Sequence, residues 1–448
     1  MKESMNTPRA VWNNQFGFMM SAAGSAVGLG NIWKFPYITG MNGGGFFVLF
    51  YLLCIVCVAL PVMIAEIYIG QKSRSNAVNA FCVLEKRPSS WKIAGMMGVL
   101  ATILILSFYA VVGSWIFYFL QQSIFGFERF ATREGVQHLF LEMTELAWVS
   151  FGYQLVFILA TFGVVAAGVT AGIERLNKTL IPGLVCIIVL LLLYSSQLSG
   201  FSQACKFLFA FNMEAFTAGG MLEAVGHSFF TVSAGVGIMI TYGSYLRSDA
   251  KIAPIAGTIV IVDTLVALAS GVIIFTIVFS EQAAMSEGPV LIFKTLPLLF
   301  AQIPGGQFIA VMFFLLVTFT ALTSSVSLVE VPVAYLSDKG MSRKAALSSL
   351  LCCITCLSFF CFLSVSAAEP LTLFGLTVFD LFDQLSSKVL LPISGFLFVL
   401  FFGYKLKSPS PFVELYPAVW VRAIMKVTTL VVAPSAIALV AVKLLLFS

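Results

Sequence analysis

Long apolar runs, separated by short polar segments, make up nearly the whole chain. Eleven of them reach about 20 residues, which is the length an α-helix needs to cross a bilayer. They lie at 13–38, 44–70, 93–122, 147–169, 178–199, 222–246, 252–280, 307–336, 345–365, 372–404 and 417–447. The pattern predicts an all-α integral membrane protein with 11 transmembrane helices.

A further apolar run at 289–306 is interrupted by three prolines. Because a proline inside a helix removes a backbone hydrogen bond, this run is predicted to be a helical hairpin lying over one face of the protein. The connections are short, and the longest, at 123–147, has 25 residues. We therefore expect a single transmembrane domain over residues 1–448 and no separate soluble domain.

The composition supports burial in a bilayer. Of the 448 residues, 60% are hydrophobic and 10% are charged, and the mean hydropathy is +1.01. A soluble domain of this length could not shield so much apolar surface from water. The first apolar run is also too long, and too rich in polar residues, for a cleavable signal.

The basic residues lie mostly on one side of the predicted spans. With the N-terminus inside, the cytoplasmic segments hold 18 of them: Lys2, Arg9, Lys72, Arg74, Lys86, Arg87, Lys92, Arg175, Lys178, Arg247, Lys251, Lys339, Arg343, Lys344, Lys405, Lys407, Arg422 and Lys426. The opposite loops hold four: Arg129, Arg133, Lys206 and Lys294. This bias predicts a protein of the cell membrane with a cytoplasmic N-terminus and an external C-terminus. The net charge of +5 then reflects topology and does not indicate a nucleic-acid partner.

Two of the predicted spans contain glycine-rich interruptions. The first span reads SAAGSAVGLGNIWKFPYITG at 21–40, and the sixth reads HSFFTVSAGVGIMITYGSY at 227–245. Glycines spaced like Gly24 and Gly28 can simply let two helices pack closely. Their recurrence five spans later instead favours a pair of discontinuous helices in two inverted repeats, whose irregular backbone lines a cavity. The repeats are predicted at 11–199 and 222–404, followed by an extra span at 417–447.

A helix break of this kind offers two sorts of ligand. Freed N–H groups at the start of a half-helix attract a carboxylate. Freed carbonyls, with a nearby amide or hydroxyl oxygen, suit a hard cation such as sodium. An α-amino acid together with sodium would use both.

Polar side chains inside the spans point the same way. The ionisable ones, Lys34, Glu66, Asp263, Asp380 and Asp383, are costly in lipid and mark either structural pairs or functional positions. Asp263 has no charged neighbour in sequence, which favours a cation site. In the eighth span Thr320, Thr323, Ser324 and Ser327 share one helical face. Such hydroxyls either bind a ligand or bond to the preceding turn.

Six motifs, in order along the chain, resemble the neurotransmitter:sodium symporter family. They are AGSAVGLGNIWKFPY at 23–37, NGGGFF at 42–47, FYAVVGSW at 108–115, FFTVSAGVG at 229–237, SYLRSD at 244–249 and LTSS at 322–325. The resemblance runs from about Arg9 to the tenth span and is to the bacterial amino-acid-carrying members. It implies a LeuT-like fold of two inverted five-helix repeats with discontinuous spans 1 and 6, followed here by one extra span.

The resemblance also implies two sodium ions. The first would be bound by the Ala26 carbonyl, Asn31, Thr231 and Asp263, and completed by the substrate carboxylate. The second would be bound by the carbonyls of Gly24, Val27 and Thr320 and the hydroxyls of Thr323 and Ser324. Many relatives have asparagine in place of Asp263. The fixed negative charge of Asp263 is expected to make transport by this chain independent of chloride.

For the substrate, the resemblance implies that the amides of Leu29 and Gly30 and the Tyr109 hydroxyl hold a carboxylate. The amine would contact the carbonyls of Ala26, Phe230 and Thr231 and the Ser233 hydroxyl. Specificity is expected to depend on Ser25, Ile105, Phe230, Val236, Ser324 and Leu328. Monoamine-carrying relatives have aspartate at the position of Gly28, so this chain is expected to carry a neutral hydrophobic or aromatic amino acid.

Gates are implied on both sides of the membrane. Outside, Lys34 stands where arginine is usual, with Asp383, or alternatively Asp380, as its acidic partner. Inside, Arg9 with Asp338, aided by Trp12 and Tyr245, would close the pathway. Gly172 and Pro182 flank a segment resembling one that can unwind. Glu66 is expected to brace the break in the sixth span, and His227 to pack as an aromatic ring.

Two other functions would use the same fold. One is a proton-coupled carrier in which Asp263 titrates, and the other is a membrane amino-acid sensor that does not transport. The hydroxyls of Thr323 and Ser324 favour sodium, and the gate pair of Arg9 and Asp338 favours transport. An enzyme is not expected, because GLGNIW and GVGIM lie inside spans with no preceding strand. The oligomeric state is not predicted.

Overall fold

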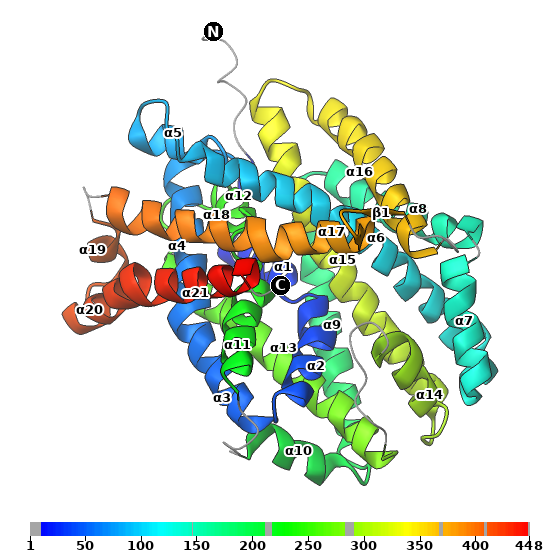
Figure 1. Ribbon diagram of the computed structural model, residues 1–448. Coiled ribbons are helices and arrows are strands. Elements are labelled where there is room, and N and C mark those ends of the chain that lie inside the picture. Colours follow the sequence, from blue (N-terminus) through cyan, green and yellow to red (C-terminus); the bar gives the residue numbers. More distant parts are fainter. Residues whose placement is uncertain are drawn as a thin grey trace.

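The computed structural model of the chain describes residues 10–145, 147–210, 217–282, 291–366, 371–406 and 410–446. Helices dominate this part of the chain (Figure 1). The strands described are one short antiparallel hairpin, β1 Thr372–Leu373 with β2 Leu376–Thr377. The prediction of an all-α membrane protein is confirmed, and it follows from the need to satisfy every backbone polar group within the bilayer.

The first half of the chain holds the first five predicted spans. The first is interrupted: α1 Gln15–Ala26 ends at a break over Val27 and Gly28, and the π-helical turn η1 Gly30–Lys34 and α2 Phe35–Met41 follow. The remaining elements are α3 Gly45–Cys54, η2 Ile55–Ala59, α4 Leu60–Ser73, α5 Ala80–Glu85, α6 Lys92–Phe125, η3 Phe127–Ala131, α7 Arg133–Glu145, α8 Ala147–Ala166, η4 Val169–Glu174, α9 Arg175–Ser195 and α10 Phe201–Phe209.

The second half repeats the interruption in its first span. Here α11 Ala218–Thr231 and α12 Ile238–Gly243 are separated by non-helical backbone at 232–237. The elements after them are α13 Ile252–Ser280, η5 Leu291–Thr295, α14 Leu296–Phe300, α15 Gly306–Asp338, α16 Arg343–Ser366, α17 Val378–Gln384, η6 Leu385–Leu390, α18 Leu391–Leu400, η7 Phe401–Lys405, α19 Pro411–Leu415, α20 Val419–Val427, η8 Thr428–Val432 and α21 Ala433–Leu446.

Nine continuous helices in the described ranges are long and apolar enough to cross a membrane. The first and sixth predicted spans are not among them, because each is divided into shorter helices. The predicted discontinuity of these two spans is therefore confirmed. The total of 11 spans stays a prediction.

Two predicted boundaries are wrong. The fifth span begins at Val169 and not at 178, because Glu174 and Asn177 are buried against α1 and not left facing water. The tenth span begins at Val378 and not at 372. Residues 372–377 form the hairpin, whose turn residues Phe374 and Gly375 have positive φ of 56° and 80°, as a two-residue hairpin turn requires.

The proline-containing run at 289–306 is represented by one short helix, formed by η5 and α14. Most of its apolar side chains, including Leu291, Phe293 and Leu296, are buried, so this segment packs into the protein. After α14 the chain makes a turn and enters α15 at Gly306, so the predicted helical hairpin is wrong for residues 291–306; residues 289 and 290 lie outside the described residues.

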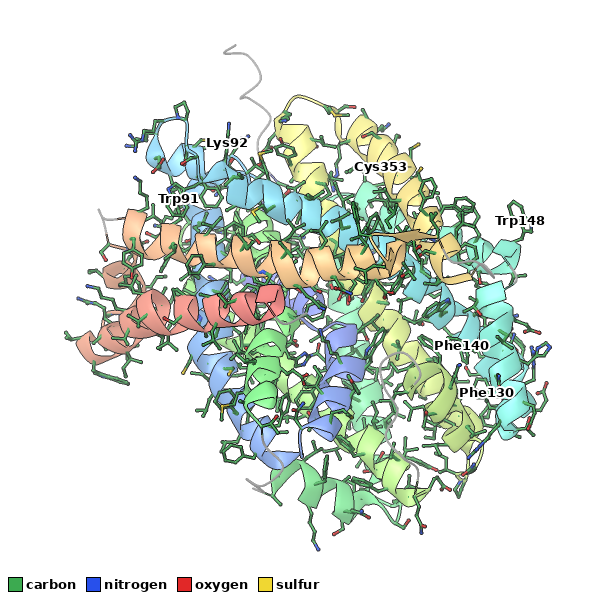
Figure 2. All side chains as sticks on the ribbon, viewed as in Figure 1. Trp91, Lys92, Phe130, Phe140, Trp148 and Cys353 are labelled. Atoms are coloured by element: carbon green, nitrogen blue, oxygen red, sulfur yellow. The ribbon has the colours of Figure 1, made fainter. Side chains whose placement is uncertain are left out.

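The packing places the end of α1 at the centre of the bundle. α1 lies against α9, α13 and α15, and the long helices α6 and α15 pack along one another. The extra span, α21, lies beside α18 (Figure 1). At the edge of the molecule, apolar side chains such as Trp148 point outward (Figure 2). Trp148 is 83% exposed. Such side chains suit contact with lipid.

Candidate functional site

The break in the first span is stabilised by a local hydrogen bond. Val27 leaves the helical conformation with φ −66° and ψ 97°, which frees backbone groups at the middle of the bundle. The Gly28 amide donates to Asn31 Oδ1 at 2.9 Å. A Cβ at Gly28 would lie 3.3 Å from Ser324 Oγ, so α15 approaches the break closely.

The break in the sixth span depends on left-handed backbone. Ser233, Gly235 and Gly237 have φ of 53°, 84° and 79°, a region that glycine enters without strain. The Gly235 amide donates to Glu66 Oε1 at 2.6 Å, and the Ser394 hydroxyl donates to the Gly235 carbonyl. Both backbone groups of Gly235 are thus satisfied by side chains from other spans.

A cavity of about 80 Å³ lies between the two breaks. All of the predicted substrate residues line it: Ser25, Ala26, Leu29, Gly30, Ile105, Tyr109, Phe230, Thr231, Ser233, Val236, Ser324 and Leu328. The Ser233 hydroxyl donates to the Ser25 carbonyl at 3.0 Å and so joins the two breaks. The buried Tyr109 hydroxyl lies beside Ser324 and the Leu29 amide, which places it next to the groups expected to hold a carboxylate.

The polar residues predicted for the first ion site meet at one end of this cavity. Asn31 Nδ2 donates to Asp263 Oδ1 at 2.8 Å and to Thr231 Oγ1 at 3.1 Å. The Thr231 hydroxyl lies 3.1 Å from Asp263 Oδ2. Asp263 is fully buried, and these hydrogen-bonding partners are neutral. A buried carboxylate surrounded by neutral oxygen and amide groups fits a bound cation, because an unpaired buried charge is very costly.

The residues predicted for the second ion site come from α1 and α15. The Ser324 hydroxyl donates to the Val27 carbonyl at 3.4 Å, and the Thr323 hydroxyl lies 3.1 Å from the Thr320 carbonyl. Gly24 lies one turn before the break and faces α9, where a Cβ would meet Asn177. The structure thus brings these oxygen donors to the same end of α1.

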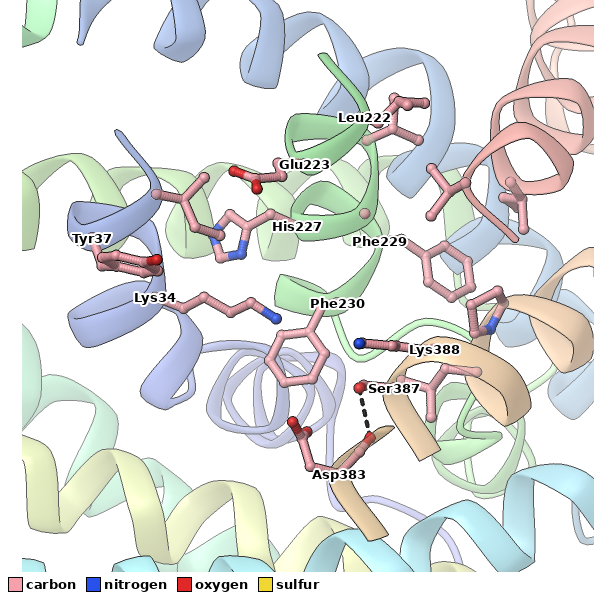
Figure 3. A pocket seen from close by; sticks show the side chains of 17 residues that line it. Lys34, Tyr37, Leu222, Glu223, His227, Phe229, Phe230, Asp383, Ser387 and Lys388 are labelled. Atoms are coloured by element: carbon pink, nitrogen blue, oxygen red, sulfur yellow. Dashed lines mark hydrogen bonds between the residues drawn. The ribbon is translucent and has the colours of Figure 1, made fainter. Parts of the chain in front are cut away.

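A larger cavity of about 320 Å³ adjoins the first and shares Phe230 and Leu391 with it. Lys34, Glu223, Asp383 and Lys388 surround it (Figure 3). The Lys34 ammonium lies 4.5 Å from the centre of the Phe230 ring. Within the described residues, Lys34 and Asp383 face this cavity without an ion pair.

The two acidic candidates for the outer gate differ in placement. Asp380 is exposed and hydrogen-bonds with Thr377 at the start of α17, whereas Asp383 lines the cavity that contains Lys34. His227 is buried, with its ring 6.0 Å from Phe35 and 5.4 Å from Tyr51. These contacts suit the aromatic packing expected of His227.

On the opposite side, Trp12 anchors the start of α1. Its backbone amide donates to the Tyr245 carbonyl at 3.1 Å, and its indole donates to the Tyr242 carbonyl at 3.0 Å. Asp338 accepts hydrogen bonds from the backbone and side chain of Asn76 at 3.2 and 2.7 Å. Arg9, the predicted partner of Asp338, lies outside the described residues.

The sequence analysis missed a network beside these residues. Glu330 is fully buried in α15, and its carboxylate accepts from Arg343 at 2.6 and 3.2 Å and from the Tyr245 hydroxyl at 2.8 Å. Arg343 also donates to the Val165 carbonyl at 2.8 Å. The available signal was Glu330 itself, an acidic residue inside the apolar run at 307–336. The cavity of about 80 Å³ between the two breaks is also lined by Gly28, Asn31, Ile238 and Leu391, which were not predicted as substrate contacts.

Comparison with known proteins gives consistent matches over nearly the whole chain. The family model described as the sodium:neurotransmitter symporter family matches residues 9–131 and 128–446. A Bacillus subtilis protein described as the uncharacterized sodium-dependent transporter YhdH is 37% identical over 406 residues, which cover 90% of each chain. A Caenorhabditis elegans sodium- and chloride-dependent betaine transporter is 25% identical over 90% of this chain and 74% of its own. The crystal structure of MhsT in complex with L-phenylalanine superposes with a TM-score of 0.89 at 38% identity, over 98% of this chain and 100% of that one.

Proposed function

The chain belongs to the sodium:neurotransmitter symporter family, a family of transporters and not of enzymes, and from that premise we propose that it imports a neutral amino acid together with sodium. The observation that carries the proposal is the cavity between the two helix breaks, whose lining residues Asn31 and Thr231 hydrogen-bond with the buried Asp263 carboxylate. One ion then shares its ligands with the substrate, and this sharing couples their movement.

The lining of the cavity supports a substrate with a neutral side chain. None of the residues that line the cavity is charged, and Ile105, Phe230, Val236 and Leu328 supply apolar surface. A charged side chain would be buried there without a partner, which costs several kcal/mol. The amides at the start of η1 and the Tyr109 hydroxyl suit a carboxylate. A hydrophobic or aromatic amino acid is therefore proposed, and the L-phenylalanine bound in MhsT accords with this choice.

Two sodium ions are proposed, with the residues assigned above to the first and second sites. Sodium prefers oxygen donors. The first set offers a carbonyl, a hydroxyl and a carboxylate oxygen beside Asn31, whose Oδ1 accepts from the Gly28 amide and whose Nδ2 donates to Asp263. The second set offers carbonyl and hydroxyl oxygens only. The relative from Caenorhabditis elegans is described as chloride-dependent. Here Asp263 places a fixed negative charge beside the first site, so we propose that chloride is not required.

Transport is proposed to proceed by alternating access across 11 spans, with the N-terminus in the cytoplasm and the C-terminus outside. Lys34 and Asp383 would close the outer side, and Trp12, Tyr245 and Asp338 with Arg9 the inner side. Net positive charge moves inward with the substrate. The membrane potential therefore contributes about 2.3 kcal/mol per charge per 100 mV.

Uptake into liposomes containing the purified protein tests the proposal. We expect an inward sodium gradient to drive uptake of at least one hydrophobic or aromatic amino acid among the twenty. Replacing chloride by gluconate is expected to leave the rate within about twofold, because Asp263 supplies the balancing charge. Uptake that follows a proton gradient without sodium would favour the proton-coupled alternative. Binding without uptake would favour a sensor.

The network around Glu330 gives a second prediction. Glu330→Gln removes the charge that pairs with Arg343 and keeps the hydrogen bond to Tyr245, so the cytoplasmic closure is weakened. The population able to bind from outside then falls, and we expect the apparent affinity for sodium to decrease by about tenfold. Sodium titration of substrate binding measures the change.

A matched control for this variant is Glu414→Gln. Glu414 is also in an ion pair, with Lys72, but its side chain is 40% exposed, and exposed ion pairs contribute little. Its sodium affinity is expected to stay within about twofold of the wild type. Equal effects of the two substitutions would show that Glu330 has no special role in closure.

A further inference from the structure

The cytoplasmic half of α1 presents small residues to the fifth span. Gly17, Ser21 and Gly24 lie on one helical face, each about one turn from the next. A Cβ at Gly17 would lie 2.1 Å from Glu174 Oε1, and one at Gly24 would lie 1.9 Å from Asn177 Oδ1. Oxygen-bearing side chains of the fifth span thus fill the space over both glycines.

Two oxygens on this face are buried without partners. Asn177 is fully buried, and its amide nitrogen donates to the Ile173 carbonyl in its own helix at 2.9 Å. This bond orients the amide and turns Oδ1 toward α1, where it has no hydrogen-bond partner among the described residues. The Ser21 hydroxyl is also fully buried, and in the same described ranges it too lacks a partner. Buried polar atoms are normally satisfied, so both oxygens keep an unused capacity to accept a ligand.

Asn177 Oδ1 and the Ser21 hydroxyl lie next to the proposed second sodium site. The Gly24 carbonyl belongs to that proposed site, and Asn177 Oδ1 lies against Gly24 itself. Ser21 lies one turn before Gly24 on the same face of α1, and side chains on a helix tilt toward its N-terminus. With the N-terminus in the cytoplasm, Ser21 is one step from the second site toward the inside.

Glu174 lies one turn further toward the cytoplasm. Its Oε2 accepts from the Asn13 amide at 3.1 Å, and its Oε1 accepts from Lys178. Because Lys178 balances its charge, Glu174 would not trap a passing cation. The row of oxygens therefore continues from the second site to the end of α1 without an unpaired negative charge.

We infer that Asn177 Oδ1 and the Ser21 hydroxyl form a transit site, which binds sodium briefly between its release from the second site and its entry into the cytoplasm. The inference rests on the proposed function, because it requires sodium to leave by this side. Two neutral oxygens, completed by water, suit a hard monovalent cation, and the absence of a charged ligand favours weak binding and rapid passage. The competing explanation is that Asn177 only packs on α1 through a weak contact with the Gly24 Cα hydrogen.

Two substitutions test the transit site. Asn177→Leu keeps the shape of the side chain but removes the oxygen, and Ser21→Ala removes the hydroxyl. Thr179→Val is the control: it lies on the same helix, is exposed, and its hydroxyl bonds to the Arg175 carbonyl of that helix. For each full-length protein, the sodium dependence of substrate binding is titrated in detergent, and the maximal rate of sodium-driven uptake is measured in liposomes.

We expect Asn177→Leu and Ser21→Ala each to lower the maximal uptake rate by about three- to tenfold, the effect of losing one hydrogen-bond-sized interaction with the passing ion. Equilibrium sodium affinity is expected to stay within about twofold in both, because the second site keeps its ligands. Thr179→Val is expected to match the wild type in both measurements.

Three results would overturn the transit site. If both variants transport at the wild-type rate, Asn177 and Ser21 only pack. If the sodium affinity falls together with the rate, these residues support the second site and not a separate one. If the wild type itself shows no sodium-driven uptake, the proposed function fails and the transit site with it. Should Asn177→Leu not fold, Ser21→Ala decides between the first two outcomes by the same measurements.

Discussion

Replacing Asp263 by asparagine is expected to raise the sodium concentration needed for half-maximal substrate binding by about a hundredfold. Asp263 is fully buried and hydrogen-bonds with the neutral Asn31 and Thr231. The bound sodium would then be the group that balances its charge. Losing one member of such a buried pair costs about 3 kcal/mol, which corresponds to about a hundredfold in an equilibrium constant.

Sodium titration of substrate binding to the purified protein measures this effect. Asparagine keeps the size of the side chain, so the thermal unfolding midpoint is a useful second reading and should change much less. Asp249→Asn is a matched control, because Asp249 is 67% exposed and pairs with Arg247 at the surface. If Asp263→Asn and Asp249→Asn bind sodium equally well, the charge of Asp263 does not balance a bound sodium ion.

The part of the candidate site that lies on the two breaks could be predicted closely. The glycine-rich segments at 24–30 and 233–237 show where the backbone leaves the helix, and the predicted substrate contacts on those segments all line the cavity. Leu391 could not be predicted in this way. It comes from α18 and reaches the cavity only through the packing of α18 against the second break, and no local pattern encodes such packing.

Burial against another helix explains the error at the start of the fifth span. The polar stretch at 169–177 reads as a loop, yet η4 and α9 include it because Glu174 and Asn177 are covered by α1. The same reason hid Glu330, which looks isolated in an apolar run but pairs with Arg343, 13 residues later and beyond the end of α15. A pattern of hydrophobic positions reports contact with lipid and core, but it does not identify the partner of a buried charge.

For the outer gate, the sequence leaves two candidate partners for Lys34, and the structure distinguishes between them. Asp380 and Asp383 are three residues apart in α17, and both suit an acidic partner for Lys34. Two observations distinguish them. The Asp380 side chain contacts Thr377 at the start of the helix, whereas Asp383 lines the cavity beside Lys34. The assignment of Asp383 as the partner of Lys34 stays a prediction. Comparing the uptake rates of Asp383→Asn and Asp380→Asn tests it.

Gly235→Ala is expected to lower the affinity for substrate by about thirtyfold or more and to lower the thermal unfolding midpoint. The φ of Gly235 is 84°, and a side chain in this conformation costs about 1 kcal/mol. In addition, a Cβ would lie 2.4 Å from the Leu391 carbonyl oxygen and 3.0 Å from the Phe229 ring. Overpacking of this kind costs about 1–3 kcal/mol, so the second break has to shift.

The shift reaches the substrate because Gly235 is tied on both sides. Its amide donates to Glu66 at 2.6 Å, and its carbonyl accepts from Ser394, so moving Gly235 disturbs both bonds and the neighbouring Ser233. Gly257→Ala is the matched control. Gly257 lies in α13, has no atom within 4 Å of an added Cβ, and should gain up to about 1 kcal/mol of helix stability. Wild-type binding by Gly235→Ala would mean that the second break can re-form with a side chain at this position, and that its geometry does not determine the cavity.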